Sequence, residues 1–211
     1  MKLKYKAVLF DFDGVIAETM EDLFLAWKNS FLKYGIEIKK EDYFPLEGTK
    51  VIEVAKIISK KYNLITNPED IVKSKNEYYL KNYNFAFYPN IDEIIDNLGK
   101  KNIKIAIVSA SPREKIAKTV KKEFLDKFDA IVCEEDYKNG KPAKDPYFNA
   151  LKKLGLNPDE AIAIENAPLG IKSAKNAGIF CIGITTTVNA EALKDADLII
   201  KDHEGLKKFL F

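Results

Sequence analysis

The sequence contains one histidine, two cysteines and one tryptophan among its 211 residues. The single histidine, His203, lies in a polar segment near the C-terminus, where we expect it to be exposed. A lone histidine argues against histidine-based acid–base catalysis and against a histidine-ligated metal site. Cys133 and Cys181 adjoin apolar stretches and lack zinc-ligand spacing, so we expect two buried, reduced thiols.

Long apolar runs and an excess of one charge are also lacking. The 34 basic residues nearly balance the 32 acidic ones, which gives no basis for a nucleic-acid or membrane partner. No stretch reaches the roughly 18 apolar residues of a membrane helix. The first apolar run, before Asp11, has four residues and is too short for a signal peptide. We therefore expect a cytoplasmic protein, and the sequence leaves a monomer and a dimer both open.

Short apolar runs rich in isoleucine and valine recur along the chain. Most do not alternate with polar residues, which is typical of strands buried on both faces of a parallel sheet. The runs cover residues 7–10, 103–108, 130–133, 161–164, 179–184 and 198–200. Helix-length segments lie between the later runs, opened by proline and closed by glycine, as from Pro89 to Gly99 and from Pro168 to Gly178. The pattern predicts an α/β fold, a Rossmann-like doubly wound parallel sheet with helices on both faces.

The segment after the first strand breaks this rhythm, because it contains no convincing strand. Helical spacing links Leu23, Trp27 and Phe31, and Asn67-Pro68 has the residue types of a helix start. About 70 residues of helix at this place indicate a small inserted domain. The predicted organisation is a core of residues 1–16 and 87–211, with an all-helical cap domain of residues 17–86 inserted after the first strand.

Polar residues follow four of the predicted strands at their carboxyl ends, the edge at which open α/β sheets bind ligands. They are Asp11 and Asp13 after the first strand, Ser109 after the second, Lys141 in the loop after the third, and Glu165 and Asn166 after the fourth. The joint placement of these groups at four strand ends predicts a catalytic site at this edge.

The residue types suit phosphoryl transfer. Acids from two strands form an oxygen-rich site that favours Mg²⁺, which keeps waters and takes one or two carboxylates. A carboxylate not used by the metal can attack phosphorus and form an aspartyl-phosphate. Lys141 and Ser109 would offset charge on the transferring group. Asp13, two residues from Asp11 and therefore on the same face of the strand, can act as general acid and then as base, while Gly14 permits the turn.

In order and spacing these residues resemble the four motifs of the haloacid dehalogenase-like phosphohydrolases. Within that family the likeness is to the phosphoglycolate phosphatase and β-phosphoglucomutase subgroup, which has a helical cap. The motifs are Asp11-Phe12-Asp13-Gly14-Val15, Ser109, Lys141 within GKPAKDPY, and Glu165-Asn166 within IENAPLGIKSAKNAGI. The resemblance extends over nearly the whole chain, from residue 6 to about residue 200.

The resemblance implies a role for each matching residue. Asp11 would be the nucleophile and Asp13 the general acid/base, while Ser109 and Lys141 would hold the phosphoryl group. Mg²⁺ would be held by Asp11, the backbone carbonyl of Asp13 and the acidic motif at Glu165-Asn166. Further substrate contacts are expected at Gly14, Thr19, Lys50, Ala110 and Arg113.

Three positions depart from the pattern of the family. Asn166 stands where an aspartate is usual and keeps a carbonyl oxygen without the charge, so we expect weaker Mg²⁺ binding. Leu23 stands where the mutase has a cap histidine, which argues against a sugar phosphomutase. The phosphate-gripping arginine of the cap is also missing, and we expect Lys50 and Arg113 to take over part of its contact. Ser111 is expected only to cap the helix that begins at Pro112.

The predicted function is Mg²⁺-dependent hydrolysis of a small phosphate monoester, of the sugar phosphate or phosphoglycolate type. Two alternatives remain open: transfer of the phosphoryl group to a second hydroxyl, as in a sugar phosphomutase, and a non-catalytic binding protein on a decayed phosphatase fold, suggested by Asn166. A response-regulator receiver also places acids, a hydroxyl and a lysine at strand ends. It is much shorter and lacks the helical insert, which argues against it.

Overall fold

The computed structural model describes residues 5–211 and contains a six-stranded sheet. All strand pairs are parallel, in the order β3-β2-β1-β4-β5-β6. The strands are β1 (Ala7–Phe10), β2 (Lys104–Val108), β3 (Ala130–Val132), β4 (Ala161–Glu165), β5 (Phe180–Ile184) and β6 (Leu198–Ile200). All six predicted runs form strands, and the predicted doubly wound α/β fold is confirmed. The start of the predicted core, residues 1–4, lies outside the described residues.

Strand β1 lies at the centre of the sheet because its side chains are apolar on both faces. All four of its residues have 0% exposure. Val8 and Phe10 pack into one hydrophobic cluster, and Ala7 and Leu9 pack into another on the opposite face. Phe10 is in register with Ile107 of β2 and with Ile164 of β4. The residues that follow these three strands therefore emerge side by side.

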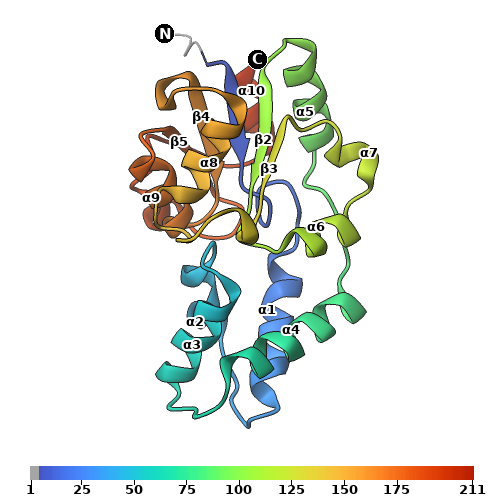
Figure 1. The fold of residues 1–211 in the computed structure, drawn as a ribbon, viewed down its shortest axis with the longest axis vertical. Coiled ribbons are helices and arrows are strands. Elements are labelled where there is room, and N and C mark those ends of the chain that lie inside the picture. The colour runs from blue at the N-terminus through green and yellow to red at the C-terminus, as the bar shows by residue number, and fades with distance from the viewer. Residues whose placement is uncertain (1–4) are drawn as a thin grey trace.

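Helices cover both faces of the sheet, as Figure 1 shows for α5 on one side and for α8 and α9 on the other. The helices that follow β1 and the helical insert are α5 (Ile91–Lys100), α6 (Arg113–Thr119), α7 (Lys122–Leu125), α8 (Asp145–Leu154), α9 (Pro168–Asn176) and α10 (His203–Leu210). Short 3₁₀ turns are η1 (Phe44–Leu46), η2 (Glu134–Asp136), η3 (Pro158–Glu160) and η4 (Ala190–Leu193). Helix α5 continues one residue past Gly99, where its end was predicted.

Residues 17–86, which we call the helical insert, form α1 (Met20–Leu32), α2 (Lys40–Tyr43), α3 (Val51–Lys61) and α4 (Pro68–Asn82). They have their own hydrophobic cluster, with Trp27, Phe31 and Ile58 buried at its centre. Asn67 accepts a hydrogen bond from the backbone N–H of Glu69 and caps α4 as predicted. The insert lies below the carboxyl end of the sheet in Figure 1.

The C-terminal segment corrects one expectation. His203 was predicted to be exposed, but it is 3% exposed at the start of α10, a helix that the sequence pattern did not reveal. Its ring stacks on Tyr88 with 4.7 Å between centroids, and Nε2 donates to the carbonyl of Val15 at 2.6 Å. The apolar face of α10, with Leu206 and Leu210 buried, draws this part of the chain onto the sheet.

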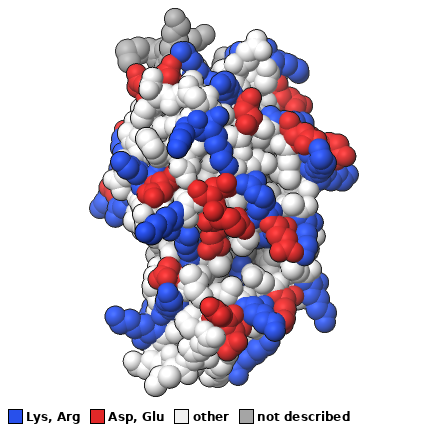
Figure 2. Space-filling view, in the orientation of Figure 1, with Lys and Arg blue, Asp and Glu red and all other residues white. Residues whose placement is uncertain are grey.

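The distribution of surface charge and the state of the two cysteines agree with what the composition suggested. Figure 2 shows basic and acidic side chains interspersed over the visible face. Cys133 and Cys181 are both buried and free. In residues 5–211 no helix combines the length and the apolar character that a membrane crossing requires.

Candidate active site

The turn after β1 places two aspartates at the edge of the sheet that faces the helical insert. The backbone N–H of Asp11 donates to the carbonyl of Ile164 at 3.0 Å, which continues the pairing of β1 with β4. Gly14 then turns the chain with a φ of +87°. A Cβ on Gly14 would lie 2.1 Å from the Asn166 side chain. Gly14 was predicted to contact substrate. In the structure its lack of a side chain allows the turn and leaves room for the Asn166 side chain.

Lys141 joins Asp11 to Glu165. Its Nζ lies 2.8 Å from Asp11 Oδ1 and 2.6 Å from Glu165 Oε1, and all three side chains are buried. Burial alone lowers the pKa of Lys141, but the two carboxylates outweigh it and raise the pKa. Burial raises the pKa of Asp11 to about 7, although Lys141 opposes the shift. Lys141 therefore remains a fixed cation beside the predicted nucleophile.

Glu165 is fully enclosed by protein partners. Its Oε1 also accepts a hydrogen bond from Tyr147 at 2.8 Å, and Oε2 accepts one from the backbone N–H of Asn166 at 3.2 Å. A Cβ on Gly170 would overlap its carboxylate at about 2.0–2.2 Å, so the absence of a side chain there makes room for Glu165. Glu165, predicted as a metal ligand, is paired with Lys141 in this structure, and its role as a ligand stays a prediction.

Asp13 is held by three side chains. Thr19 donates to Oδ1 at 2.5 Å, Ser111 donates to Oδ2 at 2.7 Å, and Lys115 Nζ lies 2.9 Å from both oxygens. Burial by itself raises the pKa of Asp13, but the hydrogen bonds and the charge of Lys115 outweigh it and the pKa is lowered. Thr19, predicted to contact substrate, contacts Asp13 in this structure.

The segment after β2 differs from its prediction at three residues. Ser111 does not cap α6, because its hydroxyl is turned to Asp13. Arg113 lies away from the site, where its guanidinium pairs with Asp136 at 2.5 Å. The cation that pairs with Asp13 is Lys115, which the sequence analysis missed. Lys115 Nζ also donates to the Ser111 hydroxyl at 2.9 Å, but Ser111 precedes α6, so helical spacing in the sequence gave no signal for this contact.

Ser109 and Ala110 line the pocket as predicted. Ser109 is 1% exposed, and its hydroxyl accepts a hydrogen bond from the backbone N–H of Ser111 at 3.0 Å. The Tyr137 hydroxyl donates to the carbonyl of Ser109 at 3.1 Å, which fixes the loop. A hydroxyl and a rigid loop thus face Asp11 and Asp13 from the neighbouring strand.

Asn166 carries an unused oxygen. Its Nδ2 donates to Thr187 at 2.9 Å, whereas Oδ1 is buried and has no hydrogen-bond partner. Buried carbonyl oxygens are rarely left without a partner. The described residues contain no group of three or more His, Cys, Asp or Glu side chains that could hold a metal. Mg²⁺ needs only one or two carboxylates, so Asp11 together with the amide oxygen of Asn166 fits that ion.

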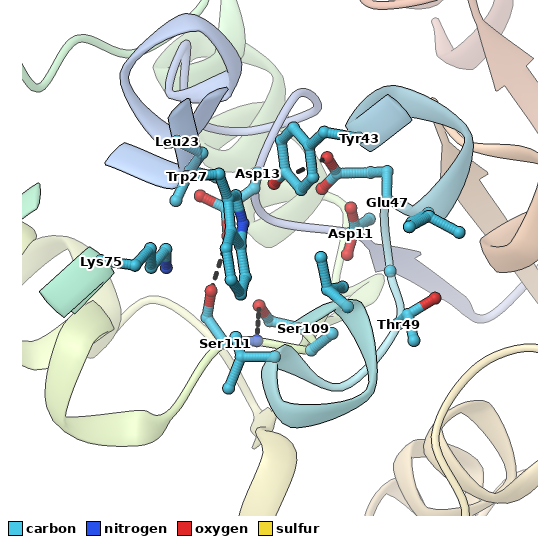
Figure 3. Close-up of a pocket in the computed structure, with 15 residues that line it drawn as sticks. Asp11, Asp13, Leu23, Trp27, Tyr43, Glu47, Thr49, Lys75, Ser109 and Ser111 are labelled. Atoms are coloured by element: carbon cyan, nitrogen blue, oxygen red, sulfur yellow. Dashed lines mark hydrogen bonds between the residues drawn. The ribbon is translucent and has the colours of Figure 1, made fainter. Parts of the chain in front are cut away.

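The helical insert closes the site from the other side (Figure 3). The pocket holds about 420 Å³ of space, part of it open to solvent. The residues of the insert that line it include Leu23, Trp27, Tyr43, Glu47, Gly48, Thr49 and Lys75. No histidine is among them, and Leu23 faces the pocket as its position in the sequence suggested. Glu47 and Lys75 are charged residues that the sequence analysis did not select.

Lys75 is a buried cation without a counter-ion. It is 2% exposed, and no carboxylate of the described residues lies within 4.0 Å of its Nζ. The Nζ lies 5.5 Å from the ring of Trp27 and 5.6 Å from that of Tyr79. Burial lowers the pKa of Lys75 to about 7, with the charge of Lys115 as the next cause. An anionic group of a ligand would supply the missing partner.

Lys50 has a different place from the one predicted. Its Nζ donates to the carbonyl of Tyr137 at 3.1 Å and lies 5.1 Å from the ring of that residue. A Cβ on Gly140 would approach the Lys50 side chain to 2.9 Å. Lys50 does not line the pocket; it joins the helical insert to the core beside Lys141.

Comparison with known proteins agrees with this arrangement. A sequence profile of the haloacid dehalogenase-like hydrolases matches residues 8–184. Validoxylamine A 7′-phosphate phosphatase of Streptomyces hygroscopicus is 28% identical over 94% of this chain and 94% of its own. The SUPPRESSOR OF QUENCHING 1 protein of Arabidopsis thaliana is 32% identical over 96% of this chain, which spans 20% of that longer protein.

Solved structures give the same answer. The β-phosphoglucomutase of Clostridium difficile superposes with a TM-score of 0.84 at 29% identity, over 98% of this chain and 97% of that one. The profile covers most of the chain, including the residues of all four predicted motifs. The chain belongs to the haloacid dehalogenase-like hydrolase family.

Proposed function

We propose that this protein is a Mg²⁺-dependent phosphatase that hydrolyses a small phosphate monoester of the sugar phosphate type through an aspartyl-phosphate intermediate. The helical insert, residues 17–86, serves as the cap that encloses the substrate. The observation that carries the proposal is the placement of Asp11 and Asp13 around one pocket with Ser109, while Lys141 is fixed 2.8 Å from Asp11.

Three oxygens would hold the metal: a carboxylate oxygen of Asp11, the backbone carbonyl of Asp13 and Oδ1 of Asn166. The unpartnered amide oxygen of Asn166 is what supports this set over one that includes Glu165. When bound, Mg²⁺ supplies positive charge that stabilises the transferring phosphoryl group. It also favours the carboxylate form of Asp11, which burial disfavours.

The reaction would have two halves, and Asp11 and Asp13 would act in both. In the first, an Asp11 oxygen forms a bond to phosphorus while the bond from phosphorus to the ester oxygen breaks, and Asp13 gives a proton to the departing alcohol. In the second, Asp13 takes a proton from water, the water oxygen bonds to phosphorus, and the bond between phosphorus and the Asp11 oxygen breaks, which frees the Asp11 carboxylate and releases inorganic phosphate. Ser109 and Lys141 stabilise charge on the phosphoryl oxygens in both halves.

Transfer to a second sugar hydroxyl is the weaker alternative. It is motivated by the likeness to β-phosphoglucomutase. The pocket has Leu23 where a base would have to activate that hydroxyl, and no histidine lines it. These features favour hydrolysis.

The test is hydrolysis of p-nitrophenyl phosphate by the full chain with Mg²⁺ and with EDTA, alongside Asp11→Asn. We expect turnover that requires Mg²⁺ and is lost in the variant. Asp92→Asn, on the exposed side of α5, is the matched control and should behave as the parent. Metal-independent turnover, or equal rates for the parent and Asp11→Asn, would refute the proposal and favour a binding protein.

A further inference from the structure

Glu47 is a carboxyl group of the helical insert that faces the two aspartates of the core. It directly follows η1 and is 5% exposed. The next residue, Gly48, has a φ of +82°, and a Cβ there would lie 3.0 Å from the side chain of Lys141. This close contact fixes the loop against the core. Figure 3 shows Glu47 at the edge of the pocket beside Asp11, with its carboxylate turned toward Tyr43.

The carboxyl of Glu47 has little of its hydrogen-bonding capacity filled. Among the described residues, the one hydrogen bond to its side chain comes from the Tyr43 hydroxyl at 3.5 Å, the limit for such a contact. No lysine or arginine of residues 5–211 lies within 4.0 Å of it. Asp13 and Glu165, the comparable buried carboxylates, have three or more donors each.

The surroundings decide what kind of group Glu47 can receive. Burial raises its pKa, and the charges of Asp13 and Asp11 raise it further, although those of Lys115 and Lys141 oppose the shift. A carboxyl oxygen accepts hydrogen bonds in the neutral and in the ionised form. An anionic group beside Glu47 would meet three acidic side chains, whereas a donor would fill the unused acceptor. On the opposite side of the pocket, Figure 3 shows a lysine, Lys75.

We propose that Glu47 is a specificity-determining residue, which accepts a hydrogen bond from a hydroxyl or ammonium group on the alcohol part of the substrate. The substrates are then phosphate monoesters of polyhydroxy or amino alcohols. This inference rests on the proposed phosphatase function and deepens it. It ranks phosphoglycolate, whose only other polar group is a carboxylate, below a hydroxyl-bearing ester at this subsite.

The test uses four esters that differ in one group: ethyl phosphate, 2-hydroxyethyl phosphate, phosphoethanolamine and phosphoglycolate. In the parent, we expect kcat/KM for at least one of the hydroxyl and ammonium esters to exceed that for ethyl phosphate about tenfold or more. Glu47→Leu should bring this ratio close to one. Glu47→Gln, which keeps a carbonyl acceptor, should retain a preference for the hydroxyl over the methyl group. Preference for the ammonium ester alone would identify an amino alcohol.

Controls separate this inference from the proposed function. Glu53→Leu, at an exposed position of α3, should keep the ratios of the parent. A ratio near one in the parent, or a ratio that Glu47→Leu leaves unchanged, overturns the role of Glu47 while phosphatase activity stands. If none of the esters is hydrolysed, the phosphatase proposal fails. The affinities of the same esters for Asp11→Asn, measured by calorimetry, then test the role of Glu47. The affinity ratios should follow the pattern expected for kcat/KM, and a failure of all the esters to bind overturns the role of Glu47.

Discussion

Lys115 Nζ lies 2.9 Å from each carboxylate oxygen of Asp13 and 4.9 Å from the centre of the Tyr79 ring. Asp13 and Lys115 belong to the core, whereas Tyr79 belongs to α4 of the helical insert. The ion pair therefore forms where the two parts of the molecule meet. Lys115 therefore contacts both Asp13, the predicted acid/base, and Tyr79 of the helical insert.

Lys115→Met should lower kcat about 10- to 100-fold, because Asp13 loses a charge partner and two charge-assisted hydrogen bonds. KM should change less, since Lys115 acts through Asp13. Lys115→Arg should restore part of kcat. Lys118→Met, which removes an exposed lysine paired with Glu114, is the control. Steady-state kinetics with p-nitrophenyl phosphate measures both constants, and an unchanged kcat in Lys115→Met would show that the pair has no part in catalysis.

Asp11→Asn should reduce turnover at least about a thousandfold, because the amide cannot attack phosphorus. The fold should persist, since Lys141 keeps its contact with Glu165 at 2.6 Å. Rapid quenching of the parent with a labelled substrate should trap phosphate on the protein, and the variant should trap none. Trapped phosphate in Asp11→Asn would point to another nucleophile.

The sheet and the acidic motifs could be predicted because local sequence determines them. Strand β1 is apolar at every position, so its place at the centre of the sheet follows from burial on both faces. Parallel strands end at one edge, which brings Asp11, Ser109 and Glu165 together without further information. The division of the chain at residues 17 and 86 stays a prediction, supported by the separate hydrophobic cluster of the insert.

Lys115, Lys75 and Glu47 of the candidate site could not be predicted in the same way, because the directions of their side chains depend on how helices and loops pack. Arg113 and Lys115 are two positions apart, about 200° around a helix, so only one of them can face Asp13. Lys75 lies in a polar helix with no sequence mark of burial, and its 2% exposure arises where α4 packs against α1 and α3. Glu47 is placed by a loop whose path depends on contacts with Lys141.

Asn166→Asp should strengthen Mg²⁺ binding, lowering the half-saturating concentration about tenfold, because a carboxylate replaces a neutral oxygen. Thr187 can keep the contact by donating its hydroxyl to the new carboxylate. The measurement is a Mg²⁺ titration of turnover, accompanied by a titration of the melting temperature that does not depend on activity. Equal half-saturation in both proteins would remove Asn166 from the metal site.

Lys75→Met should weaken substrate binding and stabilise the fold. The pKa of Lys75 is about 7, so the charge that attracts an anionic substrate is lost as pH rises through that value. For the parent, kcat/KM should therefore fall above pH 7, and this fall should be reduced in Lys75→Met. Lys73→Met, which replaces an exposed lysine two residues earlier in α4, should keep the pH profile of the parent.

Lys75→Met should raise the free energy of unfolding, by an amount that depends on pH. Between pH 7 and 10.5 the unfolded chain holds a proton on Lys75 that the folded chain has released, so the contribution of Lys75 to the free energy of unfolding rises with pH in this range. At pH 7 and below, burial of the ammonium costs stability, and the methionine variant should be more stable by about 1–3 kcal/mol. Urea unfolding at pH 7 and pH 10 measures the difference, which should shrink at the higher pH. A variant that is less stable at pH 7 would mean that contacts within the folded protein, among them the 3.4 Å hydrogen bond from Lys75 Nζ to Asn76 Oδ1, outweigh the cost of burying the charge. The charge would then not be reserved for a ligand.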